Sequence, residues 1–322
     1  MKKISITYLW TRLTALFMIL VIMLSFTSCA TDTTPDSHGN VRVTDDLERV
    51  VSVKKAPKRV ACLLGSFADI WCLAGGEVCA TAEDAWEDFG FSGDAVSIGG
   101  AHSPSVELLL SSEPELVIAS AATASNVEMR ELLESVNIPV IYFDVISFED
   151  YLEMLNICTD ITGRKDLFEK NGLKIKEQID EIKSQLSDGK IPSEKRKILL
   201  LRASSTSVKA KGSYGTVLGE MLESLGCINI ADSDGSLLES LSAEAIIKDP
   251  PYRIFVVTMG SNTAKAEEAV MSVINENPAI ASLDAVRLGR IHFMDKALFN
   301  LKPNDRWGEA YATLCQILTE ET

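Results

Sequence analysis

Aromatic and cationic residues follow the predicted strands of this chain, at positions where parallel α/β proteins bind ligands. In such sheets a ligand lies beyond the carboxyl ends of the strands. Aromatic rings offer apolar faces to a ligand, and cations pair with the oxygens of an anionic ligand. The candidate ligand-binding residues are Ser66, Phe67, Trp86, His102, Arg202, Tyr214, Met259, Phe299, Arg306 and Trp307.

Several of these residues have a structural alternative. Trp86 could pack a loop, Met259 could fill a gap in the core, and Tyr214 could brace the turn before its helix. His102 and Met259 together would suit haem, because an imidazole and a thioether form a known axial pair. The alternative for His102 is a loop histidine bonded to nearby backbone.

The motifs of the chain do not support a familiar catalytic site. The sequence has 3 histidines, His38, His102 and His292, and no G-x-S-x-G, H-E-x-x-H or P-loop motif. Gly99-Gly100 lacks the spacing of a phosphate-binding loop. A Ser-His-Asp site that uses His102 stays open as the enzyme alternative, but we expect a binding protein with no catalytic residues, resident metal or cofactor.

Alternating strands and helices must position the candidate residues. The predicted strands are residues 60–64, 78–81, 116–119, 140–143, 197–201, 228–231, 254–258 and 291–294. The predicted helices are residues 66–73, 104–110, 126–135, 215–225, 242–248, 264–275 and 304–319, with a loop at residues 82–100. This alternation predicts an α/β fold with mostly parallel sheets covered by helices.

Two segments 137 residues apart repeat one pattern. In each, a Ser-x-Glu opens a short helical stretch, a proline ends it, and an apolar run follows; the residues are Ser105 with Glu107 and Ser242 with Glu244. A long-period duplication of α/β units indicates two similar lobes. We therefore expect a ligand-binding cleft between them.

A single long helix is predicted between the lobes. From 165 to 186, charged residues surround an apolar stripe at Ile175, Ile179, Ile182 and Leu186, spaced four, three and four apart. At about 1.5 Å per residue, this helix would be roughly 30 Å long and could cross from one lobe to the other. The expected domains are an N-terminal lobe at 44–162, a connecting helix at 163–189 and a C-terminal lobe at 190–322.

The N-terminus has the pattern of an export signal. Residues 1–28 combine a positively charged start, an apolar run and small residues before Cys29. The end of this segment resembles a bacterial lipobox, with Phe26 where that pattern usually has Leu, so we expect cleavage and lipidation at Cys29. The alternative is an uncleaved anchor helix, although the apolar run is shorter than the roughly 20 residues that a span needs. Residues 29–43 are predicted to be a flexible tether, which places the folded part outside the cytoplasm, anchored to a membrane by lipid.

The charge of the chain disfavours nucleic acid as a ligand. The formal net charge is −15, and removal of residues 1–28 takes away Lys2, Lys3 and Arg12, which leaves −18. Phosphate binding needs a positive surface, which this total does not supply. A large negative total also keeps a surface protein soluble.

Six cysteines follow Cys29, and an even number in an exported protein raises the question of disulfides. Four of them lie in apolar runs typical of core strands and helices: Cys62, Cys72, Cys158 and Cys315. No C-x-x-C spacing occurs. We expect buried free thiols, and the alternative is a bridge among Cys62, Cys72, Cys79, Cys158, Cys227 and Cys315 that the sequence does not identify.

At this point the chain resembles the substrate-binding lipoproteins of iron-siderophore, haem and cobalamin ABC importers. The resemblance covers nearly everything after residue 40, with the motifs in order. In the first half it rests on Ser97-Ile98-Gly99-Gly100, Ser103-Pro104-Ser105-Val106-Glu107 and Glu113-Pro114-Glu115-Leu116-Val117-Ile118. In the second half it rests on Tyr214-Gly215-Thr216-Val217-Leu218, Leu241-Ser242-Ala243-Glu244 and Leu288-Gly289-Arg290-Ile291-His292-Phe293-Met294-Asp295.

The resemblance implies two Rossmann-like lobes joined by one rigid helix, with the ligand between them and little lobe motion. It also implies that Glu107 and Glu244 form salt bridges to arginines of a dimeric permease served by an ATPase. Two equal charges at equivalent places suit a partner with a two-fold axis. The alternative for these glutamates is a solvated helix start favoured by the macrodipole.

The expected ligand is a metal chelate, with a ferric siderophore first and haem or a corrinoid such as cobalamin as alternatives. Arg202 and Arg306 would pair with its negative charge. A different alternative is a surface receptor that works without a transporter. We expect the protein to be a monomer.

Overall fold

The computed structural model describes residues 39–187, 191–260 and 262–320. Every element below belongs to one compact unit of the chain. The predicted signal segment, Cys29 and His38 lie outside the described residues. Among the helices that are described, none is both long enough and apolar enough to cross a bilayer.

The first sheet is fully parallel and has the strand order β5-β4-β3-β6-β7. Its strands are β3 (Val60–Cys62), β4 (Val78–Thr81), β5 (Val96–Ser97), β6 (Leu116–Ser120) and β7 (Val140–Phe143). Its helices are α2 (Gly65–Leu73), α3 (Asp84–Phe89), α4 (Val106–Ser111), α5 (Ala124–Glu128) and α6 (Arg130–Ser135). The prediction of a loop at 82–100 was wrong, because α3 and β5 lie within it. The predicted helix at 126–135 is two helices that meet at Met129.

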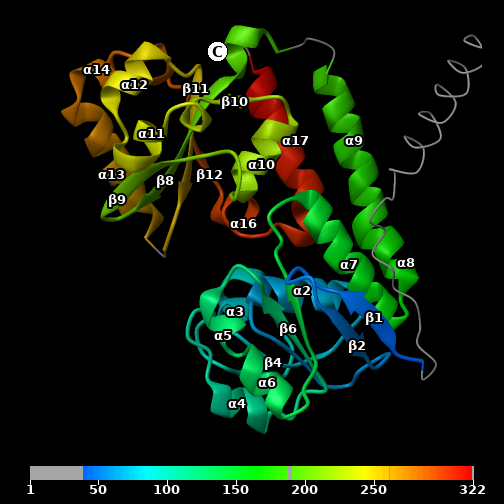
Figure 1. The fold of residues 1–322 in the computed structure, drawn as a ribbon. Helices are drawn as coiled ribbons and strands as arrows, with labels where there is room; N and C mark the ends of the chain where they lie inside the picture. Colours follow the sequence, from blue (N-terminus) through cyan, green and yellow to red (C-terminus); the bar gives the residue numbers. More distant parts are fainter. Residues whose placement is uncertain (1–38, 188–190, 261, 321–322) are drawn as a thin grey trace, which may run out of the picture. The chain divides into compact units, whose positions relative to one another are not determined.

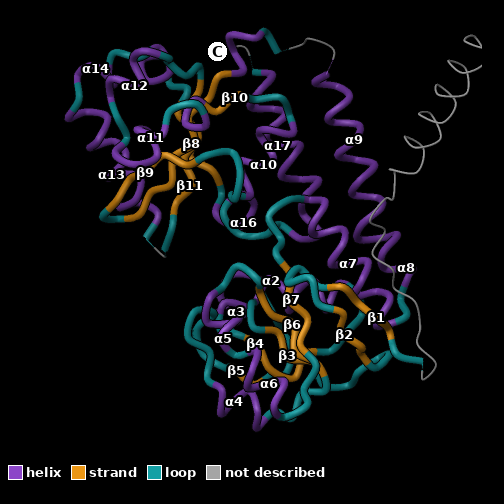
Figure 2. Tube along the Cα trace, viewed as in Figure 1, coloured by secondary structure: helices purple, strands orange, loops and turns teal. Residues whose placement is uncertain are grey.

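The second sheet repeats this arrangement with the order β10-β8-β11-β12 and an added antiparallel strand, β9. Its strands are β8 (Lys197–Ser204), β9 (Ser207–Lys211), β10 (Ile228–Asn229), β11 (Arg253–Thr258) and β12 (Ile291–Met294). Its α-helices are α10 (Val217–Ser224), α11 (Gly235–Ser240), α12 (Ala243–Lys248), α13 (Thr263–Glu276), α14 (Pro278–Ala281), α15 (Asp284–Arg287), α16 (Lys296–Phe299) and α17 (Trp307–Thr319). Short 3₁₀ turns lie at Ser193–Arg196, Ile230–Asp232 and Asn304–Arg306. The α/β class with mostly parallel sheets is confirmed, and Figure 2 shows the strands of each sheet with helices around them.

The sequence repeat has a structural counterpart in the two sheets. Ser105 caps α4 by accepting a hydrogen bond from the backbone N–H of Leu108, and Ser242 caps α12 in the same way from Ala245, each at 3.3 Å. The strand after each helix, β6 or β11, pairs with the first strand of its sheet, β3 or β8. The duplicated pattern therefore encodes the same helix–strand unit twice.

A nearly continuous helical segment connects the two sheets. It consists of α8 (Lys165–Phe168), one π-helical turn (Glu169–Leu173) and α9 (Lys174–Ser187). Ile175, Ile179 and Leu186 are buried and Ile182 is partly buried, which confirms the predicted apolar stripe. Figure 1 shows α9 running beside α17, and the two helices are in contact.

One cluster of buried side chains is shared by both sheets. It contains Val60 and Leu116 from the first sheet and Leu200 and Phe255 from the second. Helix α7 (Phe148–Thr162) and α17 contribute to the same cluster, where the ring of Phe148 lies edge-on to Trp307 with centroids 5.9 Å apart. The two sheets are therefore joined by packed apolar side chains as well as by the backbone.

A short hairpin, β1 (Val41–Thr44) and β2 (Val50–Val53), precedes the first sheet. It begins inside the range predicted as tether, and Val41 and Val43 are buried. The six cysteines after Cys29 are all free, as expected. Cys62, Cys158 and Cys227 are buried, whereas Cys72 is exposed, so burial was predicted wrongly for that residue.

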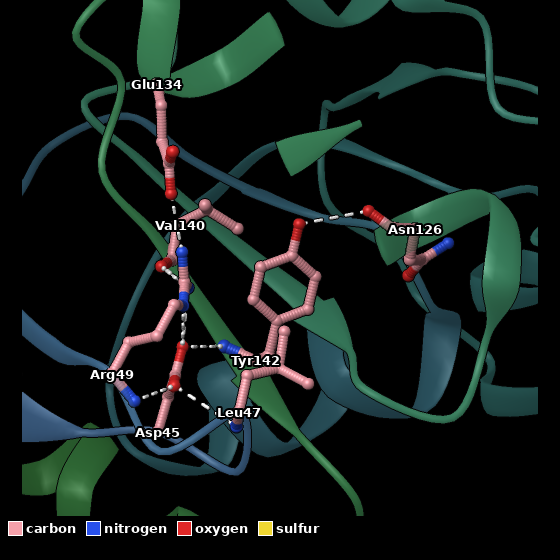
Figure 3. Close-up of polar contacts among 7 residues, drawn as sticks. All are labelled: Asp45, Leu47, Arg49, Asn126, Glu134, Val140 and Tyr142. Atoms are coloured by element: carbon pink, nitrogen blue, oxygen red, sulfur yellow. Dashed lines mark hydrogen bonds and ion pairs between the residues drawn. The ribbon is translucent and has the colours of Figure 1, made fainter. Parts of the chain in front are cut away.

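The turn of this hairpin is fixed to β7 by a buried carboxylate (Figure 3). Asp45 has no exposed side-chain surface and accepts hydrogen bonds from Arg49 at 2.5 Å and from the backbone N–H of Tyr142 at 3.3 Å. The Arg49 guanidinium also pairs with Glu134 at 2.8 Å and lies 4.9 Å from the centroid of the Tyr142 ring. The network holds the turn of the hairpin against β7, at the edge of the sheet.

We expect Asp45→Ala to lower the free energy of unfolding by about 3–5 kcal/mol, because it leaves a partly buried cation and several N–H groups without their acceptor. Urea denaturation followed by circular dichroism measures the loss. Glu134→Ala is the matched control, since it removes only the exposed partner of Arg49 and should cost less than about 1 kcal/mol. Equal losses in the two variants would contradict this view of Asp45.

Candidate ligand-binding site

Residues after the strands of the first sheet form a tightly packed corner. Gly65 follows β3, and its backbone N–H donates to both carboxylate oxygens of Asp84 at 3.1 Å. A Cβ at Gly65 would lie 2.4 Å from the backbone nitrogen of Ala85, so only glycine allows α2 and α3 to approach this closely. Burial raises the pKa of Asp84, and the hydrogen bond from Gly65 opposes that shift.

The segment after β12 carries the second sheet's contacts to this corner. Lys296 forms an ion pair with Asp88 of α3 at 2.8 Å. Asn304 donates from its side-chain amide to the backbone oxygen of Ser66 at 3.1 Å and to the carboxylate of Asp69 at 2.7 Å. Residues that follow strands of one sheet therefore touch residues that follow a strand of the other.

Lys302 lies in the same segment. Its ammonium group is 5.6 Å from the centroid of the Phe67 ring, and burial lowers its pKa, while Asp144 and Asp84 oppose that shift. Asn304 adopts a positive φ of 54°, which is uncommon for a residue other than glycine. The sequence prediction missed Lys296, Lys302 and Asn304.

Three predicted residues belong to the core. Phe67 and Trp307 have no exposed surface, Phe299 is 2% exposed, and all three lie in the cluster shared by the sheets. A side chain without accessible surface cannot contact a ligand in this arrangement. Phe67, Phe299 and Trp307 therefore pack in the core that the two sheets share, and their accessible neighbours are the better candidates for ligand contact.

Four predicted residues present accessible side chains. Tyr214 is 71% exposed, Met259 is 43% exposed and His102 is exposed. Trp86 is half-buried, and its ring lies edge-on to Phe91 with centroids 5.3 Å apart. These side chains can accept a ligand without repacking of the core.

The remaining polar candidates differ in whether their polar groups already form hydrogen bonds within the protein. Ser66 is buried, and its backbone oxygen accepts the hydrogen bond from Asn304. Arg306 is exposed and binds the Glu309 carboxylate through Nε at 2.8 Å and Nη2 at 2.9 Å. By contrast, Arg202 is half-buried, and its Nε is enclosed without a hydrogen-bond partner. Arg202 is therefore better placed than Arg306 to receive a ligand.

The two predicted docking glutamates occupy equivalent positions. Glu107 lies in the first turn of α4 and Glu244 in the first turn of α12, each two residues after its capping serine. Both are exposed, and neither forms an ion pair within the described residues. Their side chains are available to a partner.

A cavity of about 490 Å³ lies on another side of the first sheet. It is lined by Gly76, Glu77 and Val78 at the amino end of β4, together with Cys72 and Asp94 among others. Its lining contains carboxylates and no cation. It therefore does not suit an anionic ligand, although Asp69 lines it and also accepts the hydrogen bond from Asn304 in the strand-end corner. Across the described residues, no group of three or more His, Cys, Asp or Glu side chains could hold a metal ion.

Comparison with known proteins gives a consistent match. The model of the periplasmic binding protein family matches residues 60–298. The chain is 26% identical over 264 residues to the Fe(3+)-citrate-binding protein YfmC of Bacillus subtilis (strain 168), which covers 79% of this chain and 78% of that protein.

Solved structures show the same fold at lower identity. Staphylococcus aureus SirA, in a complex with staphyloferrin B, aligns with a TM-score of 0.67 and 18% identity over 87% of this chain and 99% of that chain. The periplasmic heme-binding protein RhuT from Roseiflexus sp. RS-1 aligns with a TM-score of 0.65 and 22% identity over 81% of this chain and 98% of that chain. Because the family model spans well over half of the sequence, the chain belongs to the periplasmic binding protein family, whose members are extracytoplasmic substrate-binding proteins and not enzymes.

Proposed function

We propose that the mature protein is the lipid-anchored receptor of an ABC importer, which captures a ferric siderophore between its two lobes and delivers it to a dimeric permease. The observation that carries this proposal is the meeting of strand-end residues from both sheets, through Lys296 with Asp88 and Asn304 with Ser66. Strand ends are where parallel sheets bind ligands. The similarity to YfmC, named for Fe(3+)-citrate, supports an iron chelate.

Each lobe consists of one of the two sheets together with the helices that cover it. The first extends from Val41, slightly earlier than predicted, to residue 162, and residues 163–189 connect it to the second. The accessible side chains of Trp86, His102, Tyr214 and Met259 are the proposed contacts from the two lobes. Lipidation of Cys29 would anchor the receptor at the outer side of the cell membrane.

Haem or a corrinoid is the second candidate ligand. The similarity to RhuT supports it, as do the exposed side chains of His102 and Met259, which offer an imidazole and a thioether. The titration described next distinguishes haem and corrinoids from ferric siderophores.

We expect saturable quenching of tryptophan fluorescence when the mature protein is titrated with its ligand, tested with ferric citrate, ferric hydroxamates, ferric catecholates, haem and cobalamin. Among the described tryptophans, Trp71 and Trp307 have no exposed surface and Trp86 is half-buried. Quenching should therefore fall sharply in Trp86→Phe, while calorimetry still detects binding. If calorimetry detects none of the five ligand types, the proposed function is wrong.

A further inference from the structure

Three cations share one face of the hairpin formed by β8 and β9. In this antiparallel pair Arg202 lies opposite Lys209, and Leu200 lies opposite Lys211. Directly opposed residues project to the same face, and so do residues two apart on one strand. Arg202, Lys209 and Lys211 therefore form a single basic face.

The basic face lies on the side of the sheet that carries the shared core. Along β8, Ile198 and Leu200 belong to the cluster that both sheets share, whereas Leu199, Leu201 and Ala210 belong to a cluster confined to the second half of the chain. Alternation places Arg202 in the row of Ile198 and Leu200, toward the carboxyl end of β8. The basic face therefore lies near the carboxyl end of β8, where the proposed ligand site is expected.

In the part of the chain that the structure describes, these cations have no side-chain partner. Within the described residues, none of the three side chains takes part in a hydrogen bond or an ion pair, and the Nε of Arg202 is buried without an acceptor. Burial lowers the pKa of both Arg202 and Lys211, and for Lys211 the neighbouring Arg202 adds to the shift. Acidic side chains outnumber Lys and Arg by 46 to 31 in this chain. A cluster of three cations without acidic partners is therefore not expected from the amino-acid composition alone.

A buried, unpaired donor on a charged group is costly unless something binds to it. Arg202 presents a planar fork that matches a carboxylate, and the two lysines supply point charges. Tyr214 lies three residues after the end of β9 and is 71% exposed, so an accessible aromatic side chain follows the hairpin. Together these groups fit a ligand with several carboxylate oxygens.

We infer that the captured chelate is anionic, with iron(III) held by carboxylate-bearing arms, and that Arg202, Lys209 and Lys211 bind those carboxylates. This inference rests on the proposed function and names the ligand class of the same site. It predicts selection against neutral chelates, because a neutral ligand would leave the partly buried Arg202 and Lys211 without a charged partner.

The test compares calorimetric Kd values for ferric citrate, which is anionic, and for a neutral ferric trihydroxamate. We expect the wild-type protein to prefer ferric citrate, and Arg202→Gln and Lys211→Gln each to weaken ferric citrate binding by about 10- to 100-fold, the range for a charged hydrogen bond. Raising the salt concentration should reduce the preference. Lys174→Gln with Lys265→Gln is the matched control, since both lysines are exposed on helices, α9 and α13, and neither belongs to the basic face.

The outcomes separate the inference from the proposed function. If Arg202→Gln and Lys211→Gln bind ferric citrate like the wild type, or the wild type prefers the neutral chelate, the inference is overturned while capture of a chelate still stands. Failure of the wild-type protein to bind any chelate overturns both. An unchanged thermal midpoint shows that each variant is folded, so weaker binding is then a property of the site.

Discussion

Cells whose only copy of this protein carries Glu107→Lys and Glu244→Lys are expected to take up the iron chelate at least about tenfold more slowly, with an unchanged Kd for the chelate. Both glutamates are exposed at equivalent helix starts and have no ion pair within the described residues. Reversal would place like charges against the arginines expected on the permease, a juxtaposition that costs several kcal/mol. Uptake of radiolabelled iron by cells, with calorimetry of the purified variant, measures the two effects.

The control for this experiment carries the same change in net charge elsewhere. Glu131 in α6 and Glu268 in α13 are also exposed on helices, so Glu131→Lys with Glu268→Lys alters the total charge equally. This control should transport normally. A loss of chelate affinity in the Glu107 and Glu244 variant, or normal uptake by it, would remove these residues from the docking surface.

Trp307→Ala is expected to lower the free energy of unfolding by about 3–5 kcal/mol, the usual cost of removing a fully buried aromatic ring. Trp307 has no exposed surface, packs edge-on to Phe148 of α7, and lies 6.4 Å from Tyr311 between ring centroids. The ring belongs to the cluster that both sheets share. Urea denaturation of the variant should therefore show earlier unfolding and a division of the single transition into two.

Two comparisons make this prediction specific. Trp307→Phe keeps most of the volume and removes an indole Nε1 that is buried without a hydrogen-bond partner, so it should cost much less than alanine. Phe293→Ala removes a ring that is 37% exposed at the edge strand β12 and should cost about 1 kcal/mol or less. Equal losses from Phe293→Ala and Trp307→Ala would show that the shared core does not hold the sheets together.

The sequence predicted elements well where apolar residues dominate a short run or follow a helical period. The strands at 78–81, 140–143 and 291–294 were predicted with the observed bounds. The connecting helix was predicted from the spacing of four isoleucine and leucine residues, three of which are buried. In these segments burial and local pattern agree, so no knowledge of distant contacts is needed.

Elements held by tertiary contacts were missed. Helix α3 has only Ala85 buried and depends on the approach of Gly65 and on the Asp84 hydrogen bonds, none of which has a local signal. Strand β9 contributes only the small side chains Val208 and Ala210 to a core, so its alternation is weak in the sequence. It becomes a strand by pairing with β8, and this is why the lysines of the basic face were not predicted.

The sequence predicts a site at the strand ends, but it does not show which side chains there are accessible. Arg202 is half-buried and Tyr214 is exposed, so both stay candidates for ligand contact, whereas Phe67 and Trp307 are enclosed in the core. Asn304 reaches Asp69 across 235 positions of the chain. Such a contact follows from how the two halves meet, which no short pattern encodes.

The apolar packing that unites the two halves has a consequence for transport. Wide separation of the halves would expose Trp307, Phe148 and their neighbours to water, at about 25 cal/mol for each Å² of apolar surface. Occupied and vacant receptors should therefore offer the transporter nearly identical docking faces. Vacant copies would then act as competitors at the membrane, and the rate of import would depend on the fraction of receptor that is loaded.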